Sequence, residues 1–507
     1  MLVVMNKRFT GYAALSLVVV CALAGRIPSV HAQAAASTNH TPQPAAAPIA
    51  TPALQPAPAI EAPAPAAPPA PSSWFARKPL RLEGGEGSDH WSVTLFGFIE
   101  ADYIFDSTRS YEDAIGPSLV ARTDTYAGRA GRTQFSVRNT RLGLAFAAPN
   151  LAGVRASALL EADFFGNQAA TTEKAFFDSP ALRLRHAYLQ LQSRYLDVLA
   201  GHTYGLIGFQ NYFFPCTLEF LGVPNQLLSR SAQLRLSRSL RLSRDFSLDV
   251  AAAAVRPAQR DASIPDVQAG VRLNVQRWKG ITTPGNTGTS AVPMSVGISG
   301  TLRQFKVNAF APPPTQRSNT AAGWGLAVDA LLPLIAAADS DDRANRLTFT
   351  GSFVTGTGIA DLITSGGGAS FPTLPNPAQA NPAPLYTANI DDGLVSFDTQ
   401  GVLHTIDWWA MRAGLQYYLP PTGRILISVN YTQSYSGNMS KLFPRGGAEI
   451  ELLTRVANRS HYADLNLMWD ATPAIRLGLS GQYTQVVYLD GDKPHNLRVM
   501  GQAVYVF

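Results

Sequence analysis

Residues 92–106 read SVTLFGFIEADYIFD, and their side chains alternate in character along the chain. The apolar side chains share one phase of a two-residue period: Val93, Leu95, Ile99, Ala101, Tyr103 and Phe105. Most of the polar side chains share the other phase: Thr94, Glu100, Asp102 and Asp106. A period of two is the signature of a β-strand. We therefore expect a strand with one apolar face and one polar face.

Similar alternation recurs in fifteen further segments, so the sequence predicts about sixteen strands. These segments lie at about 133–147, 153–165, 182–192, 197–204, 232–240, 245–255, 266–276, 295–303, 323–331, 346–354, 404–417, 424–435, 460–469, 474–486 and 495–507. Apolar residues spread over so many short alternating runs are typical of a wall that faces lipid on one side and water on the other. The predicted fold is all-β, a transmembrane antiparallel β-barrel.

The connections between these segments tend to alternate between short and long, as in an up-and-down barrel. Short connections lie at 149–151, 193–196, 419–423 and 470–473, and long ones at 107–132, 166–181, 205–231, 304–322, 355–403 and 436–459. Both ends of the chain would then lie in the periplasm with the short turns. The stretches 277–294 and 332–345 are longer than turns, so we expect the strand register to be least certain there.

The N-terminal region predicts export. Lys7 and Arg8 precede an apolar run at 12–23 and the small-residue sequence Val30-His31-Ala32, so residues 1–32 are interpreted as a secretory signal peptide. Residues 33–90 are rich in Ala and Pro and predict a disordered periplasmic tether. Residues 91–507 would form the barrel domain, integral to a bacterial outer membrane and surrounded by its lipid.

The charge balance and the cysteine count exclude several classes of protein. The chain has 41 Lys and Arg against 35 Asp and Glu, and the signal contains Lys7, Arg8 and Arg26, so 38 basic residues remain against 35 acidic ones. This balance does not indicate a nucleic-acid partner. Outside the signal only Cys216 remains, and one thiol forms neither an intrachain disulfide nor a multi-thiol zinc site.

The polar faces of the strands predict the residues that line the interior of the barrel. A charge that faces lipid at the midplane costs about 2 to 4 kcal/mol, so these side chains should point inward. The predicted pore-lining residues are Arg141, Arg155, Arg235, Arg272, Arg412, Arg476, Arg498, Glu100, Asp102, Glu161 and Asp163. The carboxylates would oppose the arginines and create a transverse field. Arg138, Arg183 and Arg185 fall on the wrong phase, which indicates either a β-bulge or a face that contacts a neighbouring subunit.

Three short motifs resemble the DcaP-like family of bacterial outer-membrane porins. They are Leu95-Phe96-Gly97-Phe98-Ile99-Glu100-Ala101-Asp102, Arg183-Leu184-Arg185-His186-Ala187-Tyr188 and Leu199-Ala200-Gly201-His202-Thr203-Tyr204. The resemblance covers about residues 93–507 and implies a homotrimer of sixteen-stranded barrels that passes small anionic solutes such as dicarboxylates. The terminal Tyr505-Val506-Phe507 resembles the signal that the barrel-assembly machinery reads. Family members often carry a coiled-coil extension, whereas this chain has an Ala/Pro segment without heptads, so a helical stalk is not expected.

By analogy with such porins, the long connection at 206–231 would fold into the barrel and narrow it. Its polar residues are Asn211, Tyr212, Glu219, Asn225, Gln226 and Arg230, set among apolar residues such as Phe213 and Phe220. An ordinary outer loop is the alternative interpretation. Cys216 lies in this loop without a neighbouring Lys or His in sequence, so we expect an inert thiol.

Motifs that would indicate catalysis are missing from the sequence. It has no His-Glu-x-x-His, Gly-x-Ser-x-Gly, phosphate-loop or paired-Cys motif, and its histidines are scattered. We expect no enzyme activity, no metal site and no cofactor. The resulting hypothesis is a passive diffusion pore for small polar solutes, with a mild preference for anions. The alternatives are a phosphate- or sugar-selective porin and a non-conducting structural or adhesin barrel.

Overall fold

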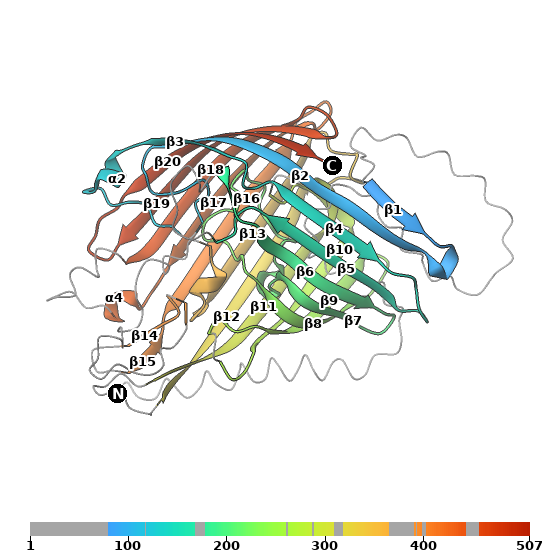
Figure 1. The fold of residues 1–507 in the computed structure, drawn as a ribbon, viewed down its shortest axis with the longest axis horizontal. Helices are drawn as coiled ribbons and strands as arrows, with labels where there is room; N and C mark the ends of the chain where they lie inside the picture. The colour runs from blue at the N-terminus through green and yellow to red at the C-terminus, as the bar shows by residue number, and fades with distance from the viewer. Residues whose placement is uncertain are drawn as a thin grey trace.

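A computed structural model describes residues 80–116, 118–167, 178–259, 262–285, 288–308, 318–364, 390–391, 393–397, 402–442 and 456–507. These residues form a closed antiparallel barrel of sixteen wall strands, with strands that tilt steeply across the wall (Figure 1). The predicted signal peptide and the first part of the predicted tether, residues 1–79, lie outside the described residues. Within the described residues, no helix is long and apolar enough to cross a membrane.

The wall begins at β2 (Trp91–Asp106) and ends at β20 (His495–Val506), and these two strands pair to close the barrel. The second wall strand is interrupted and comprises β3 (Arg132–Ser136) and β4 (Arg141–Ala147), both of which pair with β2. The remaining wall strands, which pair with their neighbours in chain order, are β5 (Arg155–Asp163), β6 (Arg183–Gln192), β7 (Asp197–Tyr204), β8 (Arg230–Arg241), β9 (Phe246–Val255), β10 (Asp266–Thr282), β11 (Ser290–Asn308), β12 (Ser318–Ile335), β13 (Arg346–Thr357), β16 (Asp407–Tyr418), β17 (Ile425–Tyr435), β18 (Ala457–Asp470) and β19 (Ile475–Tyr488).

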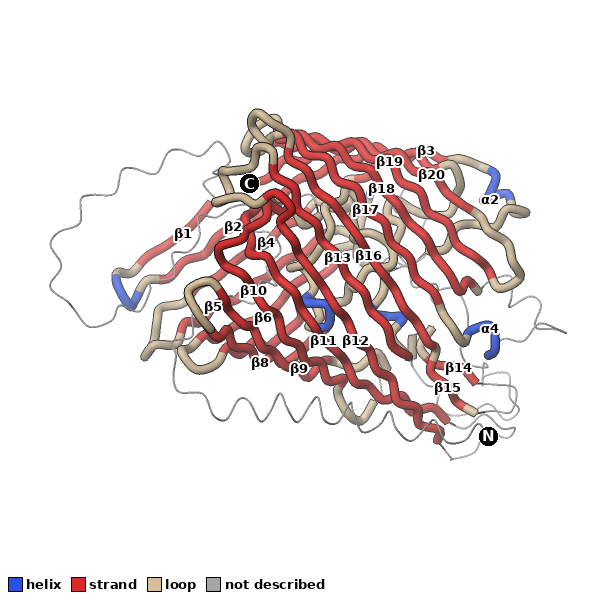
Figure 2. The backbone as a smooth tube through the Cα atoms, turned by 180° about the vertical axis from the view of Figure 1, so that it is seen from behind, coloured by secondary structure: helices blue, strands red, loops and turns tan. Residues whose placement is uncertain are grey.

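The short and long connections separate to opposite ends of the barrel. The C-terminus and the extra strand β1 (Leu80–Gly84) lie at the short-turn end (Figure 1). The short helices α2 (Tyr126–Arg129) and α4 (Met439–Leu442) and the hairpin β14 (Val395–Phe397) with β15 (Leu403–Thr405) lie at the other end (Figures 1 and 2). The described residues also contain three single 3-10 turns: η1 (Gly87–Asp89), η2 (Ile207–Phe209) and η3 (Ala360–Leu362).

Of the two stretches that broke the sequence pattern, most of 277–294 is strand, whereas 332–345 is strand only as far as Ile335. β10 and β11 continue as a paired hairpin up to Thr282 and Ser290, with a register shift between Val275 and Lys279. β12 continues to Ile335, with a second irregularity between Pro333 and Ile335. A bulge inserts residues that oppose no partner, so the two-residue alternation loses its phase at that point. These strands therefore continue beyond the segments in which the sequence showed a clear period.

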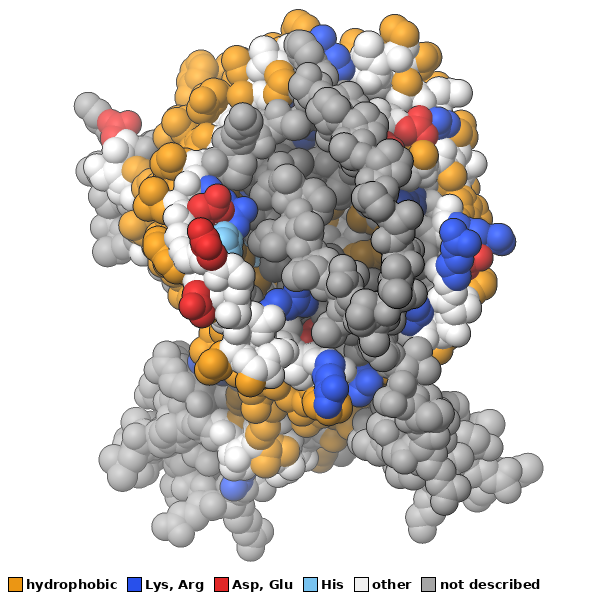
Figure 3. Space-filling model, turned by 90° about the vertical axis from the view of Figure 1, so that its right-hand side faces the viewer, with side chains coloured by type: hydrophobic (Ala, Val, Ile, Leu, Met, Phe, Trp, Pro, Cys, Tyr) orange, Lys and Arg blue, Asp and Glu red, His pale blue; other side chains and the backbone are white. Residues whose placement is uncertain are grey.

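The alternation along each strand separates an apolar exterior from a polar interior. On β20, Leu497 is 51% exposed while Arg498 beside it is 1% exposed, and on β19, Leu479 is 55% exposed while Ser480 is 1% exposed. Seen from the end that carries β1, hydrophobic side chains surround the outer wall (Figure 3). Apolar groups on the outside and polar groups on the inside are the arrangement that a wall between lipid and water requires.

Residues 80–90 differ from the predicted tether. Leu80–Gly84 form β1, which pairs with residues 91–95 of β2, and η1 follows in the connecting turn. The sequence LRLEG alternates apolar and charged side chains, which is a strand pattern that the Ala/Pro composition farther upstream concealed. The prediction of a disordered segment is therefore wrong for residues 80–90.

Candidate functional site

The connection between β7 and β8, residues 205–229, lies inside the barrel; we call it the inner loop. Its first part is hydrogen-bonded to the inner faces of β10 and β11. The Leu206 N–H donates to Gln268 Oε1 at 2.7 Å, and the Gly208 N–H donates to Ser299 Oγ at 2.7 Å. The Tyr212 hydroxyl lies 2.7 Å from Ser295 Oγ. Polar side chains of two neighbouring strands, β10 and β11, thus hold the first part of the loop at three points.

Glycines in the wall make room for this part of the loop. A Cβ atom at Gly270 would lie 2.9 Å from the Phe209 ring, and a Cβ at Gly297 would lie 3.0 Å from it. On β12, a Cβ at Gly325 would lie 3.3 Å from Ile207 Cδ1. The three adjacent strands β10, β11 and β12 therefore each have a glycine where η2 packs closely against the wall. Larger side chains at these positions would push the loop away from the wall.

The second part of the inner loop crosses to the opposite wall. The Cys216 carbonyl accepts hydrogen bonds from Asn430 Nδ2 at 2.7 Å and from Ser428 Oγ at 2.9 Å. Thr217 Oγ1 donates to Asp464 Oδ2 at 2.8 Å. Cys216 is fully buried, and burial raises the pKa of its thiol to about 12, so the thiol stays protonated and unreactive. The loop is fixed at both walls of the barrel.

A second inward segment, residues 359–364, pairs with the end of the inner loop. The Asn225 N–H donates to the Thr364 carbonyl at 2.7 Å, and the Leu228 N–H donates to the Leu362 carbonyl at 3.0 Å. Arg303 on β11 anchors this segment, because its guanidinium contacts Asp361 at 2.5 Å and Asp266 at 2.7 Å. The inner loop is therefore covered by another loop as well as held by the wall.

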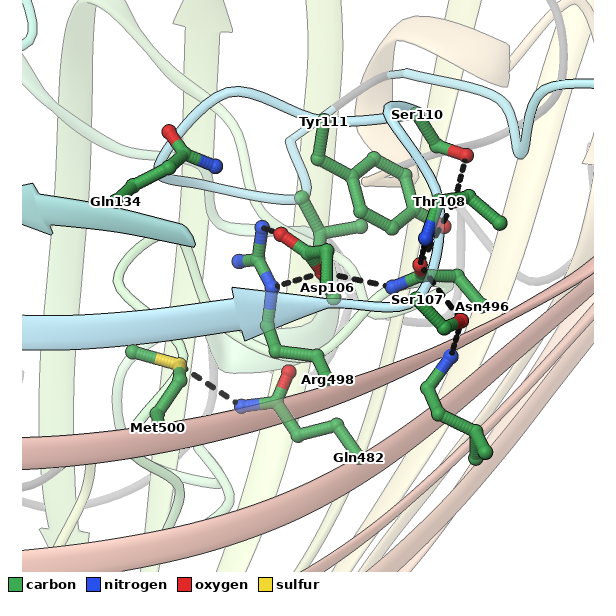
Figure 4. Close-up of polar contacts among 12 residues, drawn as sticks. Asp106, Ser107, Thr108, Ser110, Tyr111, Gln134, Gln482, Asn496, Arg498 and Met500 are labelled. Atoms are coloured by element: carbon green, nitrogen blue, oxygen red, sulfur yellow. Dashed lines mark hydrogen bonds and ion pairs between the residues drawn. The ribbon is translucent and has the colours of Figure 1, made fainter. Parts of the chain in front are cut away.

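A third inward segment, within residues 107–131, is attached to the closing strand by Arg498 (Figure 4). The Arg498 guanidinium binds both carboxylate oxygens of Asp106 at 2.9 Å and donates to the carbonyls of Asp113 at 2.8 Å and Glu112 at 3.0 Å. It also lies 3.3 Å from Glu219 of the inner loop. One buried arginine thus joins β2, β20, the first connection and the inner loop.

Glu219 is the titratable group that connects these segments. Its Oε1 accepts the Ile115 N–H at 2.9 Å, and its Oε2 faces Arg498. Burial raises the pKa of Glu219 to about 7, although the Arg498 charge lowers it in part. The charge of this side chain therefore changes near neutral pH.

Between the inner loop and the wall lies a cavity that is open to solvent; we call it the arginine cavity. The wall contributes Asn139, Arg141, Arg185, Tyr204 and Arg230, and the inner loop contributes residues that include Asn211, Glu219 and Gln226. Three cationic side chains thus line one side of the arginine cavity and face polar groups of the inner loop.

Carboxylates on the same wall neutralise part of this charge. Arg185 contacts Glu161 at 2.6 Å and Asp163 at 2.8 Å, Arg183 contacts Asp163 at 2.6 Å, and Arg141 lies 3.5 Å from Glu161. Arg230 forms no ion pair in the described part of the chain, and its guanidinium lies 5.6 Å from the Tyr204 ring centre. Glu161 and Asp163 thus lie beside the arginines on the same wall, while Glu219 of the inner loop lines the other side of the cavity.

A β-bulge explains why Arg185 has the wrong phase in the sequence. The register between β5 and β6 shifts between Glu161 and Ala162, which pair with His186 and Leu184. Arg185 and His186 are consequently both buried, so the alternation reverses at this point. Of the two alternatives that the sequence left open, the bulge is the one that the structure shows.

The structure places most of the predicted interior residues on the inner face, but their surroundings differ. Arg272, Arg476 and Arg498 form ion pairs with Asp249, Asp470 and Asp106 respectively. Arg235 and Arg412 form no ion pair in the described residues, and they donate to backbone carbonyls of Tyr204 and Phe213. Glu100 and Asp102 are buried on β2. Arg155 is only half-buried and lies at the short-turn end of β5, because that strand begins with it.

The predicted loop residues are also distributed unevenly. Asn211, Glu219 and Gln226 line the arginine cavity, and Arg230 is the first residue of β8. The Tyr212 side chain packs between the loop and β11, and burial there raises its pKa. The Asn225 side chain bonds to Thr432 and Ser434 on β17. These two side chains therefore hold the loop and leave the cavity to the others.

Sequence reasoning missed Arg303 and Asp113. Arg303 shares its phase with Ser299 and Thr301 on a predicted strand, so the alternation could have identified it as an inward residue. Asp113 lies in a long connection and contacts Arg138 at 3.0 Å. A loop residue without periodicity offers no signal of this kind. In the described residues, no group of three or more His, Cys, Asp or Glu side chains could hold a metal ion.

Comparison with known proteins supports the fold. No family model and no curated protein sequence matches the chain. The crystal structure of the outer membrane channel DcaP of Acinetobacter baumannii matches with a TM-score of 0.58 and 16% sequence identity, over 84% of this chain and 100% of that chain. An anion-selective porin from Comamonas acidovorans matches with a TM-score of 0.43 and 10% identity, over 82% of this chain and 100% of that chain. The predicted resemblance to DcaP is confirmed at the level of the fold.

Proposed function

We propose that this protein is a porin of the bacterial outer membrane, a passive diffusion channel for small polar solutes that prefers anions such as dicarboxylates. The observation that carries the proposal is the arginine cavity, a solvent-open space between a fixed inner loop and a wall that presents Arg141, Arg185 and Arg230. The apolar exterior supports the placement in a lipid bilayer. Diffusion down a gradient needs no energy source and no moving domain.

The charges around the cavity favour anions. Arg141, Arg183 and Arg185 are balanced in part by Glu161 and Asp163, which leaves one positive charge on this wall before Arg230 adds a second. Low-dielectric walls focus this potential in a narrow passage and raise the local concentration of anions. A guanidinium also offers two parallel N–H donors to a carboxylate, so a dicarboxylate could engage two arginines at once.

Other parts of the proposal concern assembly and export. We propose a homotrimer, recognition of the C-terminal Phe507 by the barrel-assembly machinery, a cleaved signal at residues 1–32 and short turns that face the periplasm. In the folded barrel the Phe507 N–H and carbonyl bond to Gly97 of β2 at 3.1 and 3.2 Å, so its backbone can pair with another chain only before closure. The proposal includes neither catalysis nor a cofactor.

Two measurements on the purified protein test the proposal. In planar bilayers under a salt gradient, the reversal potential should show anion selectivity, and cation selectivity would contradict the proposed preference. Liposome swelling should be faster with dicarboxylates than with sugars of similar size. Faster swelling with sugars, or an equal rate for phosphate and dicarboxylates, would favour the sugar- or phosphate-selective alternative. The absence of any conductance would favour the third alternative, a non-conducting structural or adhesin barrel.

A further inference from the structure

A continuous group of basic side chains occupies one arc of the short-turn rim; we call it the basic arc. It consists of Arg194, Arg238, Arg241, Arg244, Arg277 and Lys279. These residues lie on neighbouring ends of β6 to β10, because β7 pairs with β8 through Asp197 and Ser237, and the Gln276 N–H donates to the Asp245 carbonyl at 2.7 Å. Figure 3 views the end of the barrel to which these turns belong.

The charge of the basic arc is nearly uncompensated. Arg194, Arg241 and Arg244 are exposed and form no ion pair in the part of the chain that the structure describes. The Arg277 side chain is 73% exposed and reaches Asp245 only at 3.9 Å. Arg238 and Lys279 donate to the carbonyls of Tyr195 and Ala338. Cations that the protein itself does not neutralise are available to an anionic partner.

Exposed apolar and aromatic side chains accompany these cations. Tyr195 is 59% exposed, Leu242 57%, Trp278 41% and Phe246 40%. The Arg194 guanidinium lies over the Tyr195 ring at 4.4 Å. Aromatic rings beside arginines are suited to the boundary between acyl chains and headgroups, where each type of group meets its preferred surroundings.

The rest of the short-turn rim lacks this character. The turns at 148–154 and 471–474 contain no charged residue. In the turn at 336–345, Asp342 is paired with Arg346 and Arg343 with Asp470. Arg424 donates to the carbonyls of Asp470 and Ala471. Exposed basic side chains are thus concentrated in the sector of β6 to β10, while elsewhere on this rim Arg155 stands singly at the start of β5 and the turn at 336–345 also carries Asp339 and Asp341.

We propose that the basic arc binds the phosphate headgroups of anionic phospholipids in the leaflet that surrounds the short-turn end. The proposal rests on the proposed placement in the outer membrane and goes beyond the proposed channel activity. The arginines would contact the headgroups while Leu242, Phe246 and Trp278 contact the acyl chains. Each Lys or Arg near an anionic lipid surface contributes about 1 kcal/mol, or about fivefold in binding.

Native mass spectrometry of the full-length protein with added phosphatidylglycerol or phosphatidylcholine tests this inference. The test variant carries Arg194→Gln, Arg241→Gln, Arg244→Gln and Arg277→Gln. The matched control removes four exposed charges from the opposite end with Arg109→Gln, Arg129→Gln, Lys441→Gln and Lys493→Gln. The wild type and the control should retain phosphatidylglycerol preferentially, and the test variant should lose at least about tenfold of that preference.

An unchanged preference in the test variant, or an equal loss in the control, would overturn the proposal. Heat-dependent migration in electrophoresis verifies that each variant is a folded barrel. If the test variant does not fold, the wild type measured at rising salt decides instead, because screening should abolish the preference. Conductance is measured in parallel, so a barrel that binds the lipid but does not conduct would refute the channel and not the lipid site.

Discussion

The two walls that face the inner loop differ in the kind of polar side chain they use. On β17 and β18, the neutral groups of Ser428, Asn430 and Asn466 bond directly to the loop backbone or to each other, and the carboxylate of Asp464 accepts from Thr217 of the loop. On β4, β6 and β8, Arg141, Arg185 and Arg230 stand away from the loop and leave the arginine cavity between them. Buried charges need partners or water, whereas neutral amides and hydroxyls can be enclosed by hydrogen bonds alone. The difference separates a wall that anchors the loop from a wall that remains open to solutes.

Reversing the charge of Arg230 should have the largest effect on selectivity. Arg230→Glu replaces the cavity arginine that forms no ion pair in the described residues, so the wall changes by two charges without breaking a pair. We expect the anion preference to disappear or to become a preference for cations, which reversal potentials would show. Arg277→Glu, an equal change on the exposed outer rim, is the control and should leave selectivity unaltered. The same result in both variants would mean that the cavity does not set selectivity.

Enlarging a glycine under the loop should have the next largest effect. Gly297→Leu places a side chain where a Cβ alone would lie 3.0 Å from the Phe209 ring, so the first part of the inner loop must move off the wall. We expect a larger single-channel conductance, about twofold or more, with weaker selectivity, because the passage would no longer be narrowed by a fixed loop. Gly501→Leu is the control, since nothing lies within 4 Å of a Cβ at that position. Equal conductance in the two variants would argue against the loop as the constriction.

The wall was predictable from the sequence because a closed barrel forces a two-residue period on every strand. All sixteen segments correspond to wall strands, and the inward phase of Arg235, Arg272 and Arg498 follows from the same rule. The bulge in β6 left a sign in the sequence, the wrong phase of Arg185, but the phase alone did not distinguish a bulge from a face that contacts a neighbouring subunit. The pairing of Arg498 with Glu219 was also beyond reach, since strand periodicity does not specify how a loop packs inside the wall.

Weakening the attachment of the second inward segment, residues 359–364, should have a moderate effect on the channel current. Asp361→Asn removes a carboxylate that contacts Arg303 at 2.5 Å but leaves Asp266 as a partner of the same guanidinium. A hydrogen bond to a charged group contributes about 1.5 to 3 kcal/mol, so residues 359–364 should detach more often from the inner loop. We expect more frequent current fluctuations at unchanged selectivity. Asp341→Asn in an exposed short turn is the control, and a changed selectivity in Asp361→Asn would place this segment in the passage itself.

The smallest expected effect is a pH dependence that arises from Glu219. Its pKa is raised to about 7 from an ordinary value of 4.5, so the folded protein binds more protons at this group than the unfolded chain does between these values. The free energy of unfolding should therefore fall as pH rises from about 4.5 to 7, and below that range it should not depend on this group.

The same titration affects selectivity. Above pH 7 the Glu219 carboxylate adds a negative charge beside the arginine cavity, and Arg498 neutralises it only in part because Arg498 is also paired with Asp106. Anion selectivity should thus be slightly greater at pH 6 than at pH 8, and Glu219→Gln should remove the difference. If the difference in selectivity between pH 6 and pH 8 persists in Glu219→Gln, another group in the passage titrates. Glu219 would then hold the loop without influencing selectivity.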